Sequence, residues 1–285
     1  MEGALVRLRR SAAIACTIAG PLVLVYMLLV YGGHGHDTFS YWRVPHAGPE
    51  LYAGTNDAGG QGVYRYSPVI AQVLAAFWIL PWEAFRLLWF ALELACLVWL
   101  AGRRSLLLLA LPPVWFELYT GNIHLPMAAA IALGFRFPAA WSFILLTKVT
   151  PIVGAVWFVF RRDWRAVGAI VAFTAAVVGV SVAMAGPTPW FDWLVSLQAA
   201  QTTEVWPFPL PPLPVRVALG IVIVAWGART DRYWTVPVAA TIALPVLWGH
   251  GLTLLLAALK APRPATSEAA APQAAAPYPS RQAVA

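Results

Sequence analysis

Long runs of apolar residues, and not an alternation of apolar and polar positions, dominate the pattern of this chain. Residues 11–31 and 166–185 contain no charged side chain. A helix needs about 20 apolar residues to cross a hydrocarbon core of about 30 Å. The strands of a membrane barrel would instead alternate lipid-facing and lumen-facing residues. The two runs therefore predict membrane-spanning helices.

Shorter apolar runs predict further helices of the same bundle. Residues 67–80 are bounded by Pro68 and Pro81 and are too short for a span, which favours an interfacial or re-entrant helix. Residues 190–200 predict an amphipathic helix that lies along the membrane surface. The remaining short runs, each predicting one membrane helix, cover residues 87–102, 105–120, 125–134 and 213–227.

Two apolar runs carry a polar residue near the centre and predict broken helices. Residues 137–160 contain Lys148 and Pro151 in mid-run. A charge in the middle of the bilayer is costly and proline interrupts a helix, so we expect two short half-helices that meet at Lys148. Residues 235–260 repeat this arrangement, with a hinge at the sequence PVLWGH that ends at His250.

Composition agrees with an integral membrane protein. Hydrophobic residues make up 60% of the 285 and charged residues 11%, and the mean hydropathy is +0.70, all outside the range of soluble domains. The formal net charge of +7 comes from short arginine clusters at the ends of apolar runs, which is the pattern of cytoplasmic loops. We therefore expect membrane lipid, and no nucleic acid, as the partner of these charges.

The arginine clusters also predict the topology and the domain limits. If they face the cytoplasm, the first apolar run delivers a polar, glycine-rich loop, residues 31–65, to the outer side. Residues 1–260 then form one polytopic, all-α transmembrane bundle of about 8–10 membrane helices, some short or broken, with interfacial helices on the outer side. Residues 261–285 are rich in proline, alanine, serine and glutamine and predict a disordered tail.

This topology gathers a set of polar side chains on the outer face of the membrane: His34, His36, Asp37, Arg65, Asn122, His124, Lys148 and His250. A carboxylate that faces cations and imidazoles suits attack by a hydroxyl on a carbon that bears a phosphate leaving group. Asp37 would accept the hydroxyl proton. The phosphate would be held by Arg65, Lys148 and His250. A lipid-borne phosphate substrate would explain why this site lies at the membrane boundary.

Simpler interpretations of the first loop remain open. Asp37 could be a solvated loop residue or a helix cap, and Asp57 is a rival carboxylate in the same loop. His34, His36 and Asp37 could also ligate a divalent metal. Alternate positions in a glycine-rich loop do not fix a coordination geometry, however, so we predict neither a metal nor a cofactor.

The polar residues within apolar runs have structural alternatives as well. Lys148 could snorkel to the membrane surface or pair with an acid such as Glu93 or Glu117. Glu93 could instead form a buried pair with Arg216. His124 could be a packed histidine with satisfied ring nitrogens, and its role stays open.

Five short motifs follow one another along the chain: DTFSY at 37–41, YRYSP at 64–68, GNIH at 121–124, KVTP at 148–151 and PVLWGH at 245–250. In this order they resemble glycosyltransferase family 87, the polyprenol-phosphate-mannose-dependent membrane mannosyltransferases. The resemblance covers nearly all of residues 1–260 and adds Tyr41, Tyr66 and Trp248 to the expected site. Where the family usually has Gly-Gln-x-Asn, this chain has GNIH, and its last motif lacks the usual flanking Ser, Asp and Tyr.

The resemblance implies the GT-C architecture for residues 1–260 and an inverting transfer. In that family an aspartate of the first outer loop is the catalytic base, which would be Asp37 here. The implied donor is a hexose, mannose first, on a polyprenyl phosphate, and the acceptor is a glycolipid or glycan outside the cytoplasm. The lipid phosphate leaves readily when cations hold it, so no metal is needed. The expected location is the cell membrane, with several spans and an extracytoplasmic active site.

Two other functions are compatible with the sequence. A transporter or flippase of a lipid-linked substrate would also need a set of polar residues, although transporters place their site near the bilayer midplane between repeated halves. No repeat is apparent in this chain. A third possibility is an inactive family member that serves as a structural partner in an envelope-assembly complex, which the altered GNIH turn keeps open.

Overall fold

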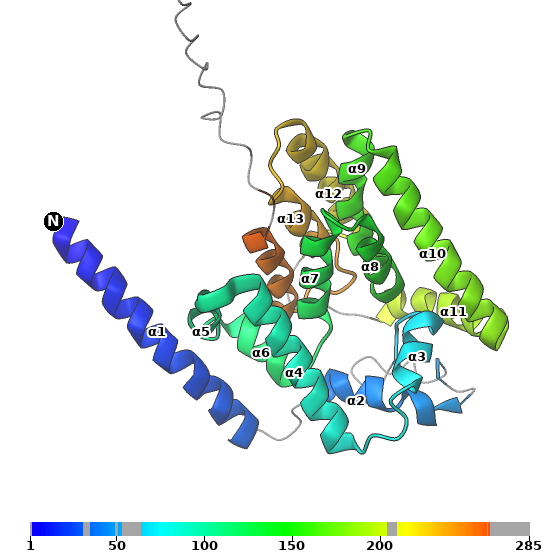
Figure 1. Ribbon diagram of the computed structural model, residues 1–285, viewed down its shortest axis with the longest axis horizontal. Coiled ribbons are helices and arrows are strands. Elements are labelled where there is room, and N and C mark those ends of the chain that lie inside the picture. Colours follow the sequence, from blue (N-terminus) through cyan, green and yellow to red (C-terminus); the bar gives the residue numbers. More distant parts are fainter. Residues whose placement is uncertain are drawn as a thin grey trace, which may run out of the picture.

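A computed structural model of the chain shows a bundle of helices (Figure 1). It describes residues 2–30, 35–48, 51–52, 64–203, 210–260 and 262, and within them every regular element is a helix. The predicted all-α fold is therefore confirmed. The predicted tail lies outside the described residues except for Pro262.

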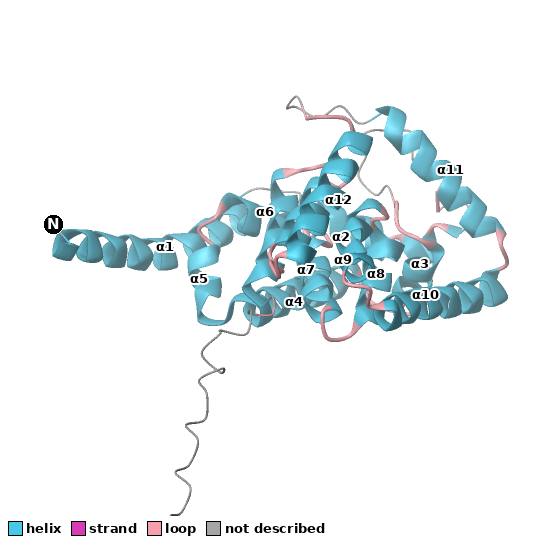
Figure 2. Ribbon diagram, turned by 90° about the horizontal axis from the view of Figure 1, so that it is seen from above, coloured by secondary structure: helices cyan, strands magenta, loops and turns pink. Residues whose placement is uncertain are grey.

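The described elements are α-helices (α) and 3-10 helices (η), and Figure 2 draws helices in cyan and loops in pink. In chain order they are α1 (Glu2–Val30), α2 (His36–Trp42), η1 (Val44–His46), α3 (Pro68–Ala75), α4 (Trp82–Ala101), η3 (Gly102–Arg104), α5 (Ser105–Leu108), α6 (Pro112–Thr120), α7 (His124–Gly134), η4 (Pro138–Ala140), α8 (Trp141–Thr147), η5 (Thr150–Ala155), α9 (Val156–Phe160), α10 (Trp164–Ala185), α11 (Thr188–Thr203), α12 (Leu213–Arg229), α13 (Thr235–Ile242) and η6 (Gly249–Lys260).

Three of the described segments are long and apolar enough to cross a membrane: Arg10–Val30, Trp82–Leu108 and Trp164–Ala185. The first and third lie in α1 and α10, on opposite sides of the molecule (Figure 1). Only 11% of each of these two segments is buried. A helix that exposes apolar side chains along most of its surface suits lipid and not water. The chain is therefore a membrane protein.

Gly20 determines where α1 meets the bundle. α1 packs against α5 and α6. A Cβ atom at Gly20 would lie 2.5 Å from the backbone nitrogen of Ala110, so only glycine permits this close approach. Toward its N-terminus, α1 projects away from the bundle in both views (Figures 1 and 2).

The predicted helix break at Lys148 is confirmed. α8 ends at Thr147, and η5 and α9 continue the run from Thr150. Lys148 itself has an extended backbone, with φ −131° and ψ 109°. Pro151 stands in the first turn of the second half, where its missing N–H costs no helical hydrogen bond. Lys148 therefore lies outside both half-helices.

The predicted hinge between residues 235 and 260 is confirmed too, because α13 ends at Ile242 and η6 begins at Gly249. Three carbonyl oxygens at this hinge accept hydrogen bonds of 2.7–3.0 Å from the Arg216 guanidinium, those of Ile242, Leu244 and Pro245. The same guanidinium donates to the carbonyl of Pro211, which precedes α12. The Thr150 hydroxyl donates to the carbonyl of Ala243. The two helix breaks therefore lie against each other.

A possible ion pair does not form, and one expectation about a helix is wrong. Arg216 does not pair with Glu93, because it bonds the hinge carbonyls, while the buried Glu93 carboxyl bonds no other described residue. Residues 105–120 do not form one helix. The chain turns between α5 and α6, and Pro112 and Pro113 occupy the first turn of the new helix, a position that proline favours.

α7 is a central helix of the bundle and contacts α4, α8 and η6. Its side chains are apolar around most of the circumference, and Leu125, Met127 and Ile131 are fully buried. A helix of this kind belongs in a packed interior. The first residue of α7, His124, is fully buried as well, so the amino end of α7 brings polar groups into the core.

Candidate active site

Asp37 lies in the first turn of α2, and contacts to the turn between α6 and α7 fix that helix. Gly35 precedes α2 with a φ of +79°, and its N–H donates to the carbonyl of Tyr119 at 2.7 Å. The Thr38 hydroxyl donates to the carbonyl of Gly121 at 3.2 Å. α2 and the GNIH turn, residues 121–124, are therefore held together as one unit.

Gly121, the first residue of the GNIH turn, ends α6 in the left-handed conformation with a φ of +68°. A Cβ atom at this position would overlap the Thr38 hydroxyl. Glycine is needed here for its backbone angle and for the space it leaves.

Asn122 orients the carboxyl group of Asp37. Its side-chain Nδ2 donates to Asp37 Oδ2 at 2.7 Å, and its Oδ1 accepts the N–H of Ile123 at 2.8 Å. Burial raises the pKa of Asp37, while the Asn122 hydrogen bond and the charge of Lys148 oppose that rise. The carboxylate that results is a stronger base than an exposed aspartate, and it stays aimed by Asn122.

Glu117 of α6 is fully buried and is satisfied by the amino end of α7. Its Oε1 accepts the backbone N–H groups of His124 at 2.6 Å and Leu125 at 3.2 Å, and its Oε2 lies 3.0 Å from His124 Nδ1. The first N–H groups of a helix have no partner within the helix and favour a negative charge. The Glu117 carboxylate supplies a hydrogen-bond acceptor for these N–H groups and a negative charge beside the helix end.

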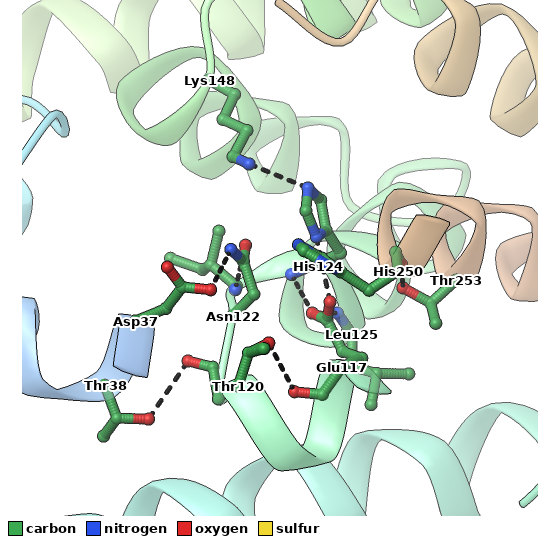
Figure 3. Close-up of polar contacts among 12 residues, drawn as sticks. Asp37, Thr38, Glu117, Thr120, Asn122, His124, Leu125, Lys148, His250 and Thr253 are labelled. Carbon is green, nitrogen blue, oxygen red and sulfur yellow. Dashed lines mark hydrogen bonds and ion pairs between the residues drawn. The ribbon is translucent and has the colours of Figure 1, made fainter. Parts of the chain in front are cut away.

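Lys148 joins the same cluster from the helix break. Its Nζ lies 2.8 Å from His124 Nε2 (Figure 3). A lysine ammonium only donates hydrogen bonds, so we assign Nε2 as the acceptor and place the ring proton on Nδ1, facing Glu117. The result is a chain of hydrogen bonds from Lys148 through His124 to Glu117.

His250 lies beside this chain, next to the His124 ring (Figure 3). The two ring centroids are 5.2 Å apart, and the Phe116 ring packs on His250 at 5.1 Å. His250 is 5% exposed, and neither of its ring nitrogens bonds another described residue. A buried histidine with both nitrogens unused is a candidate for ligand binding.

Glu117, His124 and His250 offer ligand atoms within 4.8 Å of one another, and two imidazoles with a carboxylate are a common set for a divalent ion. The hydrogen bonds do not fit that use. Lys148 occupies Nε2 of His124, and the proton that we assign to Nδ1 faces Glu117. This arrangement fits a hydrogen-bonded network better than a metal centre.

The structure brings together five of the expected site residues, Asp37, Asn122, His124, Lys148 and His250 (Figure 3). They come from α2, from the GNIH turn with α7, from the break after α8 and from η6. Residues from four separate parts of the chain therefore meet in one polar cluster.

The other expected residues lie around this group. His36 is the first residue of α2. Arg65 belongs to the segment before α3, which runs beside the end of α8 because Ser67 N–H donates to the carbonyl of Leu146 at 3.1 Å. Trp248 is 48% exposed at the hinge. His34 and Asp57 lie outside the described residues.

Tyr41 and Tyr66 are buried, and their hydroxyls bond each other at 2.9 Å. The Tyr52 hydroxyl donates to the carbonyl of Tyr66, also at 2.9 Å. These contacts join α2 to the segment before α3. The two motif tyrosines therefore support the placement of Asp37, and any contact with substrate stays a prediction.

The sequence drew attention to Glu117 only as one possible partner of Lys148. The available signal was an acid within an apolar helix, which marks a functional or paired group. Glu93 gives the same signal, so the pattern alone could not choose between them.

A family model described as glycosyltransferase family 87 matches residues 64–275. The match covers well over half of the 285 residues and includes Asn122, Lys148 and His250, whereas Asp37 precedes it. Comparisons with curated proteins and with solved structures find no match.

Gly121→Ala should destabilise the protein by about 2–4 kcal/mol, because alanine resists the left-handed conformation and its Cβ meets Thr38. The measurement is equilibrium unfolding in detergent. In a Thr38→Ala background the penalty should be smaller by roughly 1–2 kcal/mol, since the overlap with the hydroxyl is gone. Equal losses of unfolding free energy in the two backgrounds would show that Thr38 of α2 does not contact this turn.

Proposed function

The chain belongs to glycosyltransferase family 87, and we propose that it transfers a hexose, with mannose as the first candidate, from a polyprenyl phosphate to a hydroxyl of a lipid or glycan acceptor. Family membership makes it a membrane glycosyltransferase. The donor, the acceptor and the inverting mechanism are proposals drawn from the site and from the resemblance of its motifs.

One arrangement carries the proposal. The Asp37 carboxylate, aimed by Asn122, and the Lys148 ammonium, bonded to His124, lie around one small group of polar side chains (Figure 3). Transfer of a sugar from a phosphate needs a base for the incoming hydroxyl and a cation for the departing phosphate. Asp37 and Lys148 are suited to these two tasks.

The proposed reaction is a single in-line displacement. The acceptor oxygen attacks the anomeric carbon while Asp37 takes its proton, so a new carbon–oxygen bond forms. The bond between the anomeric carbon and the phosphate oxygen breaks, and its electron pair goes to the phosphate. Lys148, with Arg65 and His250 as further candidates, stabilises the negative charge that develops there. One displacement inverts the anomeric centre.

We further propose that this chemistry takes place outside the cytoplasm, at the end of several membrane spans. The arginine clusters at helix ends support that orientation. A polyprenyl chain would remain in the bilayer while its phosphate reaches the site. Membership in a glycosyltransferase family favours transfer over the transport function considered from the sequence.

Asp37→Asn should lower transfer by about 10²–10⁴-fold, the usual contribution of a general base, because the amide cannot accept the proton. The measurement is mannose transfer from polyprenyl-phosphate-mannose in proteoliposomes. Asp192→Asn, an exposed aspartate of α11, is the matched control and should retain activity. Envelope glycolipids from a deletion strain, analysed by mass spectrometry after complementation with each variant, would identify the acceptor. Undiminished transfer by a folded Asp37→Asn protein would rule out the proposed base.

The pH dependence of kcat/KM should report the raised pKa of Asp37. The base must be deprotonated, so activity should rise with pH and reach half its maximum above the ordinary aspartate value. Asn122→Ala removes a hydrogen bond that lowers this pKa, and should move the acidic limb to higher pH. Ser40→Ala is the control, because the Ser40 hydroxyl donates to the backbone carbonyl of Asp37 and not to its carboxyl group. An acidic limb that stays in place in Asn122→Ala would contradict the assignment.

A further inference from the structure

The position of the Lys148 ammonium depends on its hydrogen-bond partners. Lys148 lies at a break between two half-helices, on a long and flexible side chain. Ordering such a side chain costs rotamer entropy. In the structure the ammonium is bonded to His124 Nε2 at 2.8 Å, an acceptor that is itself fully buried.

His124 can accept this bond only in one tautomer. With the proton on Nδ1, Nε2 has a lone pair for the ammonium; with the proton on Nε2, two donors would face each other. Burial raises the pKa of Glu117 to about 7. Above that pH the carboxylate is ionised and can only accept a hydrogen bond, so it selects the form with the proton on Nδ1, which lies 3.0 Å away.

Glu117 is in turn held by hydrogen bonds to the backbone. It is fully buried and its Oε1 is bonded to two backbone N–H groups at the start of α7. Each group in this series of hydrogen bonds therefore orients the next. The start of α7 orients the Glu117 carboxylate, the carboxylate orients the His124 ring, and the ring binds the Lys148 ammonium. In metal sites, a carboxylate orients a histidine ligand in the same way.

We propose that Glu117 and His124 are positioning residues that hold the Lys148 ammonium at the place where the lipid phosphate binds. The proposal rests on the proposed function for the identity of the phosphate. It gives a role to Glu117, to which the sequence motifs assign none, and it makes the histidine of the GNIH turn part of phosphate binding without contact to the phosphate.

A purely structural role for Glu117 predicts a different outcome. If Glu117 only balanced the charge of the core, its loss would weaken folding and leave phosphate binding intact in the folded fraction. Glu117→Gln separates the two roles. The amide can keep the backbone hydrogen bonds through its oxygen, but its NH2 group faces Nδ1 and forces the ring proton onto Nε2. That proton then opposes the Lys148 ammonium.

The test measures binding of undecaprenyl phosphate to the full-length protein in phosphatidylcholine nanodiscs, with undecaprenol as the neutral comparator. Glu117→Gln and Lys148→Met should each weaken phosphate binding by about 10-fold or more, with little effect on undecaprenol. The double variant should bind no worse than Lys148→Met alone, because Glu117 acts through Lys148. The matched control is Glu93→Gln, which alters a buried acid that bonds no other described residue and should bind normally.

A second variant covers the case in which Glu117→Gln does not fold. His124→Ala removes the link, while Glu117 keeps its backbone hydrogen bonds, and it should weaken phosphate binding in the same way. Folded Glu117→Gln or His124→Ala proteins that bind the phosphate as wild type does would overturn the proposal. The proposal would also be overturned if the fold losses of phosphate binding in Glu117→Gln and Lys148→Met multiply in the double variant.

The same nanodiscs separate this proposal from the proposed function. If wild type binds undecaprenyl phosphate through Lys148 and Glu117 but transfers no sugar, the proposed function fails and the positioning role stands. If wild type transfers sugar and Glu117→Gln does so with an unchanged KM for the donor, the positioning role fails and the function stands.

Discussion

The buried carboxylate of Glu117 is the interaction on which the rest of the site depends. An ionised carboxylate in a packed core costs several kcal/mol unless hydrogen bonds and an opposite charge compensate it. Here two backbone N–H groups and the His124 ring bond the carboxylate, and the Lys148 ammonium bonds the other nitrogen of that ring. This arrangement ties the end of α6 to the start of α7 and to the break after α8. The polar chemistry of the molecule is therefore assembled around one helix end.

The helix breaks are fixed features and not loose joints. Irregular backbone at membrane depth is tolerated only where protein or a polar cavity satisfies it. The hinge before η6 meets that condition through the Arg216 guanidinium, which bonds three of its carbonyls. The Thr150 hydroxyl links the two breaks directly. This bracing keeps His250 beside His124, so the groups that face the phosphate in the proposed reaction are held before any substrate arrives.

Much of this organisation follows from the sequence because single residues carry the signal. A lysine and a proline within one apolar run indicated the break at Lys148, and the PVLWGH motif indicated the hinge. The two prolines at the start of α6 carry an equal signal, yet the apolar pattern of residues 105–120 predicts one helix. Pro112 and Pro113 start a new helix within that run, because proline favours the first turn of a helix and not its interior.

The partners within the site could not be predicted in the same way. Glu93 and Glu117 both lie in apolar helices, and only the reversal of the chain at Gly121 brings Glu117 to the amino end of α7. Arg216 looked like one half of an ion pair and bonds backbone carbonyls instead, because the hinge leaves carbonyls that no helix satisfies. Such choices depend on which helix ends meet in space, which no spacing along the chain reveals.

The proposed chemistry depends on a single displacement, in which Asp37 acts as a base and never as a nucleophile. The most direct measurement is the anomeric configuration of the product, determined by NMR after transfer from polyprenyl-phosphate-mannose of known configuration. Inversion at the anomeric carbon is the predicted result. Retention would contradict it, because two successive displacements would then be required.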